Sequence, residues 1–454
     1  MRIRQAFFCF LLAFCFFLYG CSTAEITEPL PAETAQTPSS SRPVKEPVQA
    51  EPMESDEGVW QKESTLSRKL PESKWFQAAS ATFGYDALYS DLQRECYSKM
   101  KDAAYRVTEE RREQGYLISR ISLTGMLPES EIRLVLAAFL EDHPEVFWLG
   151  DSFSYGTKAG GTVIELTALY SAEECRIMQR QLLQKTEQLL EELESEMQPF
   201  ERELCLYDAL LSGCAYASDL ETSPMIFTSY GALVEGNAVC EGYAAAMQLL
   251  LRSAGIPCRV VNGTADGVAH AWNAVQLNGE WYHLDPTWGD MESGIRYDYF
   301  NVTSEILLLD HTISPDYAML TSEQICGEDD QKPQLFNLSL PDCSGTAENY
   351  YARCAILIEG LEQEGDQAIV SEIIRRIGRG KTSISFQISA VLDYEATIQM
   401  LFERQPYKIL YYLTEANRRT DVAHQVDLKQ VHYIQNKNQR AVTVMLSIIQ
   451  EESR

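Results

Sequence analysis

An Asn-Gly pair at positions 278 and 279 is the sequence feature that most constrains how this chain can fold. It separates two short segments, 268–277 and 280–285, in which Val, Trp, Tyr and Leu favour extended backbone. Asn-Gly is the strongest local signal for a two-residue hairpin turn, because both of its residues readily adopt positive φ angles. The sequence therefore predicts an antiparallel hairpin whose register is fixed by the turn.

The predicted register brings two ionisable side chains to one face of the hairpin. A two-residue turn pairs Leu277 with Glu280, and counting back from the turn sets Trp272 opposite Asp285. His270 lies two positions from Trp272, so it points to the same side of the hairpin as Asp285. The two residues become diagonal neighbours, at a separation that long side chains can bridge. A carboxylate is therefore expected within reach of an imidazole.

A second histidine, His283, lies on the same predicted face, opposite Ala274, and is an alternative base. We favour His270, because its diagonal distance to Asp285 allows the carboxylate to orient the imidazole. The simpler alternatives are that His270 is a structural histidine of the sheet and that Asp285, which precedes Pro286, only forms a turn.

The segment 237–257 is predicted to be a helix with recognisable ends. Asn237 is a candidate N-cap, and Gly255 and Pro257 end the helix. Cys240 then falls in the first turn, where unpaired backbone N–H groups and the positive end of the helix dipole favour the thiolate over the thiol. The face expected to be buried consists of Tyr243, Met247, Leu250, Leu251 and Ala254.

These three polar residues have the chemical make-up of a catalytic triad. Cys240 would be the nucleophile, His270 its base and Asp285 the acid that orients the imidazole. A lone cysteine on a helix is more often a small core residue, so the assignment depends on the fold bringing all three together. The amides of the first helical turn could also hold a developing oxyanion.

Three sequence blocks resemble the transglutaminase-like superfamily. The first covers 230–244 and contains Cys240, the second is His270-Ala-Trp-Asn, and the third is Asp285-Pro-Thr-Trp288. The spacings, 30 residues from Cys to His and 15 from His to Asp, also resemble those of the family. More loosely, the segments that precede and follow these blocks in the family resemble residues 206–216, 297–301 and His311.

The resemblance implies an α+β fold for residues 199–320. In this papain-like core a helix carrying the cysteine packs on an antiparallel sheet carrying the histidine and the acid. By position, Cys240, His270 and Asp285 match the family's nucleophile, base and orienting acid. Candidate oxyanion or substrate-wall residues are Asn237, Tyr230 and Trp272.

The reaction implied by this resemblance is acyl transfer. The Cys240 thiolate would attack a carboxamide or peptide carbonyl, and His270 would protonate the leaving amine as a thioester forms. Resolution by water would make the chain a cysteine peptidase or amidase, and resolution by an amine would make it a protein cross-linking acyltransferase. The sequence contains neither an EF-hand-like loop nor Cys/His zinc spacing, so no metal and no cofactor are predicted.

The first twenty residues predict export. Arg2 and Arg4 precede an uncharged apolar run at 7–19, which is too short to cross a bilayer as a mature helix. The run ends in Leu-Tyr-Gly-Cys21, which resembles a bacterial lipobox and so implies lipidation of Cys21. An ordinary cleaved signal and an uncleaved anchor are the alternatives. Segment 21–75, rich in Pro, Glu, Ser and Thr, is predicted to be a disordered tether, so we expect a lipid-anchored protein facing the extracytoplasmic side of a bacterial membrane.

Charge narrows the expected partners. Against 66 Asp and Glu the chain has 38 Lys and Arg, a formal net charge of −28 that repels nucleic acid and anionic lipid. Membrane contact is therefore expected only through the lipid anchor, the substrate is expected to be a protein or a cell-wall peptide, and nucleic acid is not a predicted partner. Nine of the twelve cysteines follow Cys21, and an odd number leaves at least one thiol outside any internal disulfides.

Two smaller α/β modules are predicted on either side, at 76–198 and 335–454. In the first, helices are expected at 86–112, 129–141 and 171–197, with strands at 116–123, 145–155 and 162–170. In the second, helices are expected at 366–377 and 393–404, strands at 383–389 and 407–413, and a hairpin turn at 436–438. The similar order of elements leaves open whether the two modules are degenerate repeats or unrelated.

Two non-enzymatic readings compete with the thiol enzyme. In one, the chain is a non-catalytic surface module that uses this fold to present a binding face. In the other, the flanking modules perform the function and the core is a spacer. A cysteine that reacts below the pH of an ordinary thiol would favour the enzyme over both.

Overall fold

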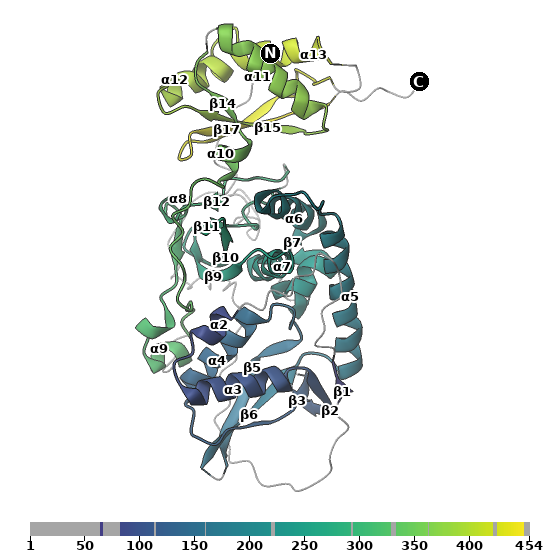
Figure 1. The fold of residues 1–454 in the computed structure, drawn as a ribbon, viewed down its shortest axis with the longest axis vertical. Coiled ribbons are helices and arrows are strands. Elements are labelled where there is room, and N and C mark those ends of the chain that lie inside the picture. Colours follow the sequence, from purple (N-terminus) through teal and green to yellow (C-terminus); the bar gives the residue numbers. More distant parts are fainter. Residues whose placement is uncertain are drawn as a thin grey trace, which may run out of the picture. The chain divides into compact units, whose positions relative to one another are not determined.

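The computed structural model describes most of the chain, in two compact units. The described residues are 64–66, 82–112, 115–158, 160–218, 223–291, 294–327, 333–361, 363–420 and 425–448. The large unit contains the described residues up to Thr346, and the C-terminal unit those from Ala347 onward (Figure 1). The predicted signal segment and lipidation site lie outside the described residues. Within those ranges, no helix combines the length and the apolar character needed to cross a bilayer.

The first half of the large unit is built on an antiparallel sheet. Its strand order is β1-β2-β3-β6-β4, with β5 also paired to β6. The strands are β1 (Ser64–Thr65), β2 (Arg106–Arg112), β3 (Gly115–Ile118), β4 (Ile121–Ser122), β5 (Leu149–Lys158) and β6 (Gly161–Ala168). The helices are α2 (Phe83–Asp86), α3 (Asp91–Ala103), α4 (Glu129–Asp142) and α5 (Ala172–Glu191). Helix α5 contacts β1 and β2 at one end and α6 and α7 at the other, so it links the two halves of this unit (Figure 1).

Helix boundaries in this half follow local signals where these are strong. The expected capping box of α5 is present, because the Ser171 hydroxyl accepts from the Glu174 amide and the Glu174 carboxylate accepts from the Ser171 amide. Helix α4 ends at His143, just before Pro144, close to the predicted boundary. The strands expected at 145–155 and 162–170 correspond to β5 and β6.

Two predictions in this half are wrong. The single helix expected over 86–112 ends as α3 at Ala103 and is followed by strand β2, because β2 pairs with β3 and this pairing outweighs the helix propensity of its Glu and Arg residues. The predicted tether is not wholly irregular either. Ser64 and Thr65 form β1 against β2, and Leu66 is buried, so a short edge strand lies inside the segment 21–75.

The second half of the large unit is a helix pair packed on an antiparallel sheet. The strand order is β12-β11-β10-β9-β13. The strands are β9 (Cys258–Ala265), β10 (Val268–Leu277), β11 (Glu280–Leu284), β12 (Phe300–Val302) and β13 (His311–Ile313). Helix α7 (Cys240–Ser253) packs on β9 and β10 and also contacts α6 (Pro199–Gly213). This is the α+β arrangement expected for 199–320.

Short elements connect this framework. They are β7 (Ala215–Tyr216), η2 (Pro224–Phe227), η3 (Gly231–Glu235), β8 (Asn237–Ala238), α8 (Ser304–Leu307), η4 (Tyr317–Met319) and α9 (Ser322–Cys326). Strands β7 and β8 form a parallel pair directly before α7. The predicted domains 76–198 and 199–320 both lie in the large unit.

The β10–β11 hairpin has the predicted register. Asn278 and Gly279 have φ angles of 51° and 90°, as a two-residue turn with two positive φ angles requires. Leu277 pairs with Glu280, and Ala274 pairs with His283. The turn residues alone therefore set which side chains of β10 and β11 share a face.

Helix α7 begins two residues later than predicted. Its N-cap is Val239, not Asn237, and Cys240 is the first helical residue. Asn237 instead lies in β8, where it pairs with Ala215. At the other end Gly255, with φ of 80°, terminates the helix as expected. The predicted inner face is buried, and so is most of the rest of α7, because β9, β10, α6 and η2 surround it.

The described part of the C-terminal unit is a sheet of order β14-β15-β17-β16 with two longer helices, α11 and α13, and several short ones. Its elements are α10 (Tyr350–Cys354), β14 (Ile356–Ile358), α11 (Gln363–Ile377), β15 (Ser383–Ile388), α12 (Tyr394–Ile398), η5 (Gln399–Glu403), α13 (Lys408–Asn417), β16 (His432–Asn436) and β17 (Ala441–Met445). Ile384, Phe386 and Ile388 point into the core from β15, as their alternation predicts. The hairpin predicted near Asn436 joins β16 to β17.

The strand predicted at 407–413 is wrong, because this segment is helix α13. Its Tyr, Ile and Leu residues favour strands by propensity, but Ile409, Tyr412, Leu413 and Ala416 are buried at helical spacing. The order of elements that suggested a repeat of the first module included this strand. The structure therefore does not reproduce that order in the C-terminal unit.

Candidate active site

Cys240 occupies the N-terminal tip of α7. The N-cap Val239 has extended backbone and offers no side-chain cap to the first helical turn. Gly242 lets this turn lie directly against η2, since a Cβ there would come within 2.4 Å of the Ile226 carbonyl oxygen. Cys240 is 2% exposed. The positive end of the helix dipole therefore acts on a thiol that is largely shielded from water.

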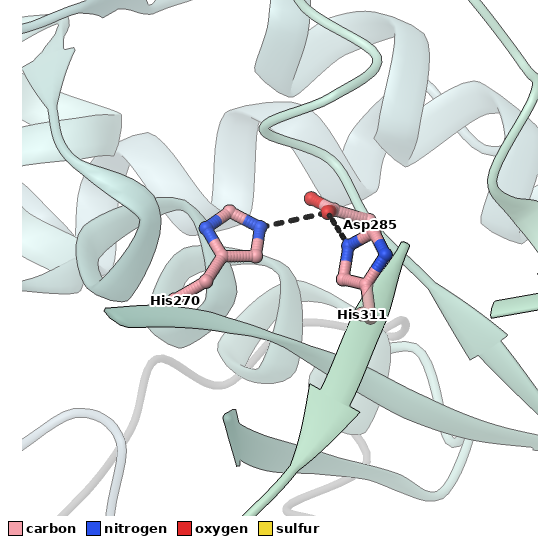
Figure 2. A group of neighbouring side chains, drawn as sticks. All are labelled: His270, Asp285 and His311. Atoms are coloured by element: carbon pink, nitrogen blue, oxygen red, sulfur yellow. Dashed lines mark hydrogen bonds and ion pairs between the residues drawn. The ribbon is translucent and has the colours of Figure 1, made fainter. Parts of the chain in front are cut away.

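His270 and Asp285 meet as the hairpin register predicts. The His270 Nε2–H donates to Asp285 Oδ2 over 2.8 Å, from near the start of β10 to the residue after β11 (Figure 2). Asp285 Oδ1 accepts the backbone N–H groups of Thr287 at 2.9 Å and Trp288 at 3.2 Å. The backbone of the turn that follows β11 thus orients the Asp285 carboxylate, and this carboxylate in turn orients the His270 imidazole.

His270 also meets the thiol, so the structure brings the three predicted catalytic residues together. Burial by itself would lower the pKa of His270, but the charge and hydrogen bond of Asp285, with a further hydrogen bond to Cys240, raise it to about 10. With Nε2 committed to Asp285, Nδ1 is the nitrogen left for the sulfur. Burial would raise the pKa of Asp285, but His270 and His311 hold it well below its ordinary range. The imidazolium is therefore the favoured form of His270 at neutral pH.

His311 is a second partner of Asp285 that the sequence did not assign to the site. Its Nε2 lies 3.3 Å from the same Asp285 Oδ2 (Figure 2). Its Nδ1 lies 2.6 Å from Asp310 Oδ1. Strand β13 brings it there by pairing with β9, with His311 opposite Ala265. The loose resemblance around His311 was the only sequence signal, and no local turn predicts this edge pairing.

His283, the alternative base, has a structural role. Its Nδ1 accepts the indole N–H of Trp272 at 3.1 Å, and its Nε2 lies 3.2 Å from the Ser304 hydroxyl. Burial, with the nearby His311, lowers the pKa of His283 to about 3. Both nitrogens of His283 therefore have hydrogen-bond partners outside the Cys240–His270–Asp285 group, whereas His270 contacts Cys240.

The other predicted site residues have separate positions. Trp272 lies beside His270, with ring centroids 6.0 Å apart and planes at 23°, and forms a buried wall of the site. Tyr230 is directed elsewhere: its hydroxyl donates to Gln181 of α5 at 2.8 Å and its ring stacks on Phe147. Asn237, in β8, lies three residues before Cys240.

The spacing of His270, Asp285 and His311 would also suit a metal ion. One nitrogen or oxygen from each lies within 4.8 Å of the others. Both Nε2 atoms, however, face a single carboxylate oxygen at distances of 2.8 and 3.3 Å, which are those of hydrogen bonds. Hydrogen bonding accounts for this geometry without an ion.

Comparison with known proteins assigns a family to this region. Residues 187–286 match the model of the Transglutaminase-like superfamily. The matched span includes Cys240, His270 and Asp285 and ends before His311. The chain therefore contains a transglutaminase-like core within its large unit.

Individual relatives match smaller parts of the chain. Kyphoscoliosis peptidase of Homo sapiens and that of Mus musculus are each 39% identical over 62 residues, which is 11% of this chain and 9% of the relative's length. The chain in a crystal structure of a TGase is 16% identical, and the match covers 40% of this chain and 54% of the TGase chain, with a TM-score of 0.24. A candidate cysteine protease from Cytophaga hutchinsonii is 14% identical, covering 39% and 68%, with a TM-score of 0.21. The family assignment accordingly rests on the sequence match at 187–286.

Proposed function

We propose that this protein is a surface-anchored thiol enzyme that acts on carboxamide or peptide bonds. The observation that carries the proposal is the position of His270, which is hydrogen-bonded to Asp285 on one side and to Cys240 on the other. This is the order of nucleophile, base and orienting acid that thiol catalysis requires. The transglutaminase-like match over the same residues supports it.

The proposed reaction passes through a thioester. The Cys240 thiolate attacks the carbonyl carbon, and the oxygen becomes an oxyanion at the N-terminal end of α7, where the dipole is positive and Val239 supplies no competing cap. The tetrahedral intermediate collapses as His270 gives its proton to the leaving amine, and the acyl group stays on sulfur. Water or a second amine then attacks the thioester, releasing acid or amide and returning the thiol.

The setting and the substrate are also proposals. A lipid anchor at Cys21 would hold the large unit at the outer side of a bacterial membrane, where surface proteins and cell-wall peptides are the accessible amides. The short similarity to two peptidases makes hydrolysis the first branch to test. No cofactor is needed for either branch.

Trapping of the acyl-enzyme tests the proposal. The full-length chain is incubated with a glutamine-containing peptide, with and without a primary-amine probe, and its mass is followed. We expect an adduct on Cys240 that Cys240→Ala lacks and the matched Cys205→Ser variant retains. Release of acid in the presence of the probe identifies a hydrolase, and release of the probe amide identifies a transferase.

A pH series of iodoacetamide labelling separates the enzyme from a non-catalytic binding module. Cys240 should react at lower pH than Cys205, and His270→Ala should remove that advantage. If the two thiols react alike in the wild-type chain, the enzyme proposal is wrong and the binding module replaces it.

A further inference from the structure

His311 is a buried histidine for which the proposed reaction has no step. Its side chain is fully buried, and each ring nitrogen faces a carboxylate: Nε2 faces Asp285 and Nδ1 faces Asp310. The rings of Trp288, Tyr299 and Trp272 surround it, with centroids 4.6, 5.2 and 5.2 Å from its own. Such an enclosed imidazole cannot turn to reach other partners.

The partners of His311 decide how many protons it holds. An ionised carboxylate only accepts hydrogen bonds, so a nitrogen that faces one must carry a hydrogen. Asp285 already accepts from His270 and from two backbone amides, and Asp310 accepts from the Tyr299 hydroxyl, so both act as acceptors. Both nitrogens of His311 are therefore donors, which makes the ring an imidazolium.

We propose, on the basis of the function proposed above, that His311 is a cationic positioning residue that sets the pH range in which the Cys240–His270 pair is active. It acts through Asp285, whose Oδ2 it shares with His270. Charges then alternate through the site, from Asp310 through His311, Asp285 and His270 to the sulfur of Cys240. His311 touches neither the sulfur nor its expected target.

The titratable groups around His311 are consistent with this charge. They are Asp285, Asp310, His270, His283 and Tyr299, with Asp298 beyond Tyr299 and paired to Arg296. Burial would lower the pKa of His311, but its hydrogen bonds to Asp285 and Asp310 raise it. The lowered pKa of the neighbouring His283 has the charge of His311 as one of its causes.

A positive charge at this position favours deprotonation of every neighbour. Removing this charge should make both the sulfur and His270 hold their protons to higher pH, because the negative charge of Asp310 is then no longer compensated by His311. His311→Gln keeps a donor for Asp285 but has no charge. We expect the acid limb of the iodoacetamide profile of Cys240 to move up by about one pH unit, so that labelling on that limb slows about tenfold.

Matched variants control for disturbed packing. His432, an exposed histidine of β16, offers His432→Gln as the same substitution away from the site, and its profile should be that of the wild-type chain. A purely structural role for His311 predicts that His311→Gln lowers thermal stability but leaves the acid limb in place. That outcome would overturn the proposal.

Nitrogen NMR reads the charge directly. In the full-length chain with ¹⁵N-labelled histidine, the His311 ring, identified by its loss in His311→Gln, should show two protonated nitrogens at neutral pH. In Asp310→Asn the His311 imidazolium should lose its proton at lower pH, because an Asn amide can donate to an unprotonated ring nitrogen, whereas a carboxylate only accepts. Should His311→Gln fail to fold, Asp310→Asn provides the test by the same signals, with the shifted resonances identifying the ring.

The two proposals can fail separately. A wild-type His311 with one protonated nitrogen at neutral pH overturns the inference even if Cys240 forms a thioester. Conversely, equal labelling of Cys240 and Cys205 refutes the enzyme proposal, whereas the NMR result still reports the charge of His311.

Discussion

The two units of this protein bury polar groups in different ways. In the large unit a group of ionisable side chains, His270, Asp285 and His311, is enclosed at one end of the sheet and paired internally. The core of the C-terminal unit is a continuous cluster of aliphatic and aromatic side chains packed around β15. Buried charges are costly unless each has a partner, whereas apolar packing is favourable in itself. The comparison teaches that the large unit gathers several buried ionisable groups into one site, whereas in the C-terminal unit the buried carboxylate Asp366 forms a single pair with Lys408 beside an apolar core.

The largest expected effect comes from breaking the charged group at its centre. Asp285→Asn removes the anion that orients His270 and raises its pKa, so labelling and acyl transfer at Cys240 should fall about 10²- to 10⁴-fold. Kinetics at neutral pH measure the loss. Asp366→Asn is the matched control, because Asp366 is a buried carboxylate of the C-terminal unit bound to Lys408. If both variants lose reactivity equally, the site is not specific to the large unit.

The next effect tests the apolar core. Phe386→Ala should lower the stability of the C-terminal unit by about 3–5 kcal/mol, because it empties a fully buried position between β14 and β17. Calorimetry should show an earlier C-terminal transition with unchanged labelling of Cys240. If labelling of Cys240 also fell, the claim that the core of the C-terminal unit does not affect the reactivity of Cys240 would be wrong.

Acid should weaken the large unit more than the C-terminal one. The pKa of His283 falls to about 3 on folding, so between its ordinary pKa and pH 3 the unfolded chain binds the extra proton and stability falls as the pH falls. Near pH 5 this amounts to about 2 kcal/mol. His283→Asn, which keeps an acceptor for the Trp272 indole, should reduce the acid sensitivity of the large-unit transition. An unchanged pH dependence in that variant would show that His283 does not cause it.

At high pH the sign reverses for His270. Its folded pKa is about 10, above its ordinary value, so its contribution to stability is complete below the ordinary pKa and is lost as the pH rises through about 10. The Asp285 contribution is present at neutral pH and is lost progressively as the pH falls from the ordinary pKa of the carboxyl toward its lowered one. Denaturant titrations across both limits should place the stability maximum of the large unit between them.

The smallest effect concerns Tyr230, which the sequence suggested as a substrate-wall or oxyanion group. Tyr230→Phe removes the hydrogen bond to Gln181 but keeps the ring on Phe147, so stability should fall by about 0.5–1.5 kcal/mol. The labelling rate of Cys240 should stay within twofold of wild type. A loss of catalysis without a loss of stability would show that Tyr230 does act on the substrate or the oxyanion.

How far the sequence predicts this molecule depends on how local each signal is. Asn278-Gly279 and the capping box at Ser171 act within a few residues, and both the hairpin register and the start of α5 were predicted correctly. The meeting of Cys240 with His270 needed the family resemblance as well, since nothing local packs α7 on β10. His311 was not assigned a role, because β13 reaches the site by edge pairing with a distant strand.

Two of the wrong predictions share a physical cause. Strand β2 contains good helix formers, and helix α13 contains good strand formers, so in each the partners in space override intrinsic propensity. The buried Leu66 was hidden in a segment whose average composition is that of a tether. Val239 became the N-cap of α7 because Asn237 was taken up by the β7–β8 pair.

Several other thiols of the large unit are buried, so their modification can report transient opening of that unit. Cys96, Cys175 and Cys343 are buried, and burial raises the pKa of each to about 12, so these thiols stay protonated at neutral pH and react slowly with an alkylating reagent. Each transient opening exposes these thiols to the reagent, so the rate of their modification measures how often the large unit opens. Oxidative attack on the large unit would therefore modify its most reactive sulfur first and the buried thiols only later.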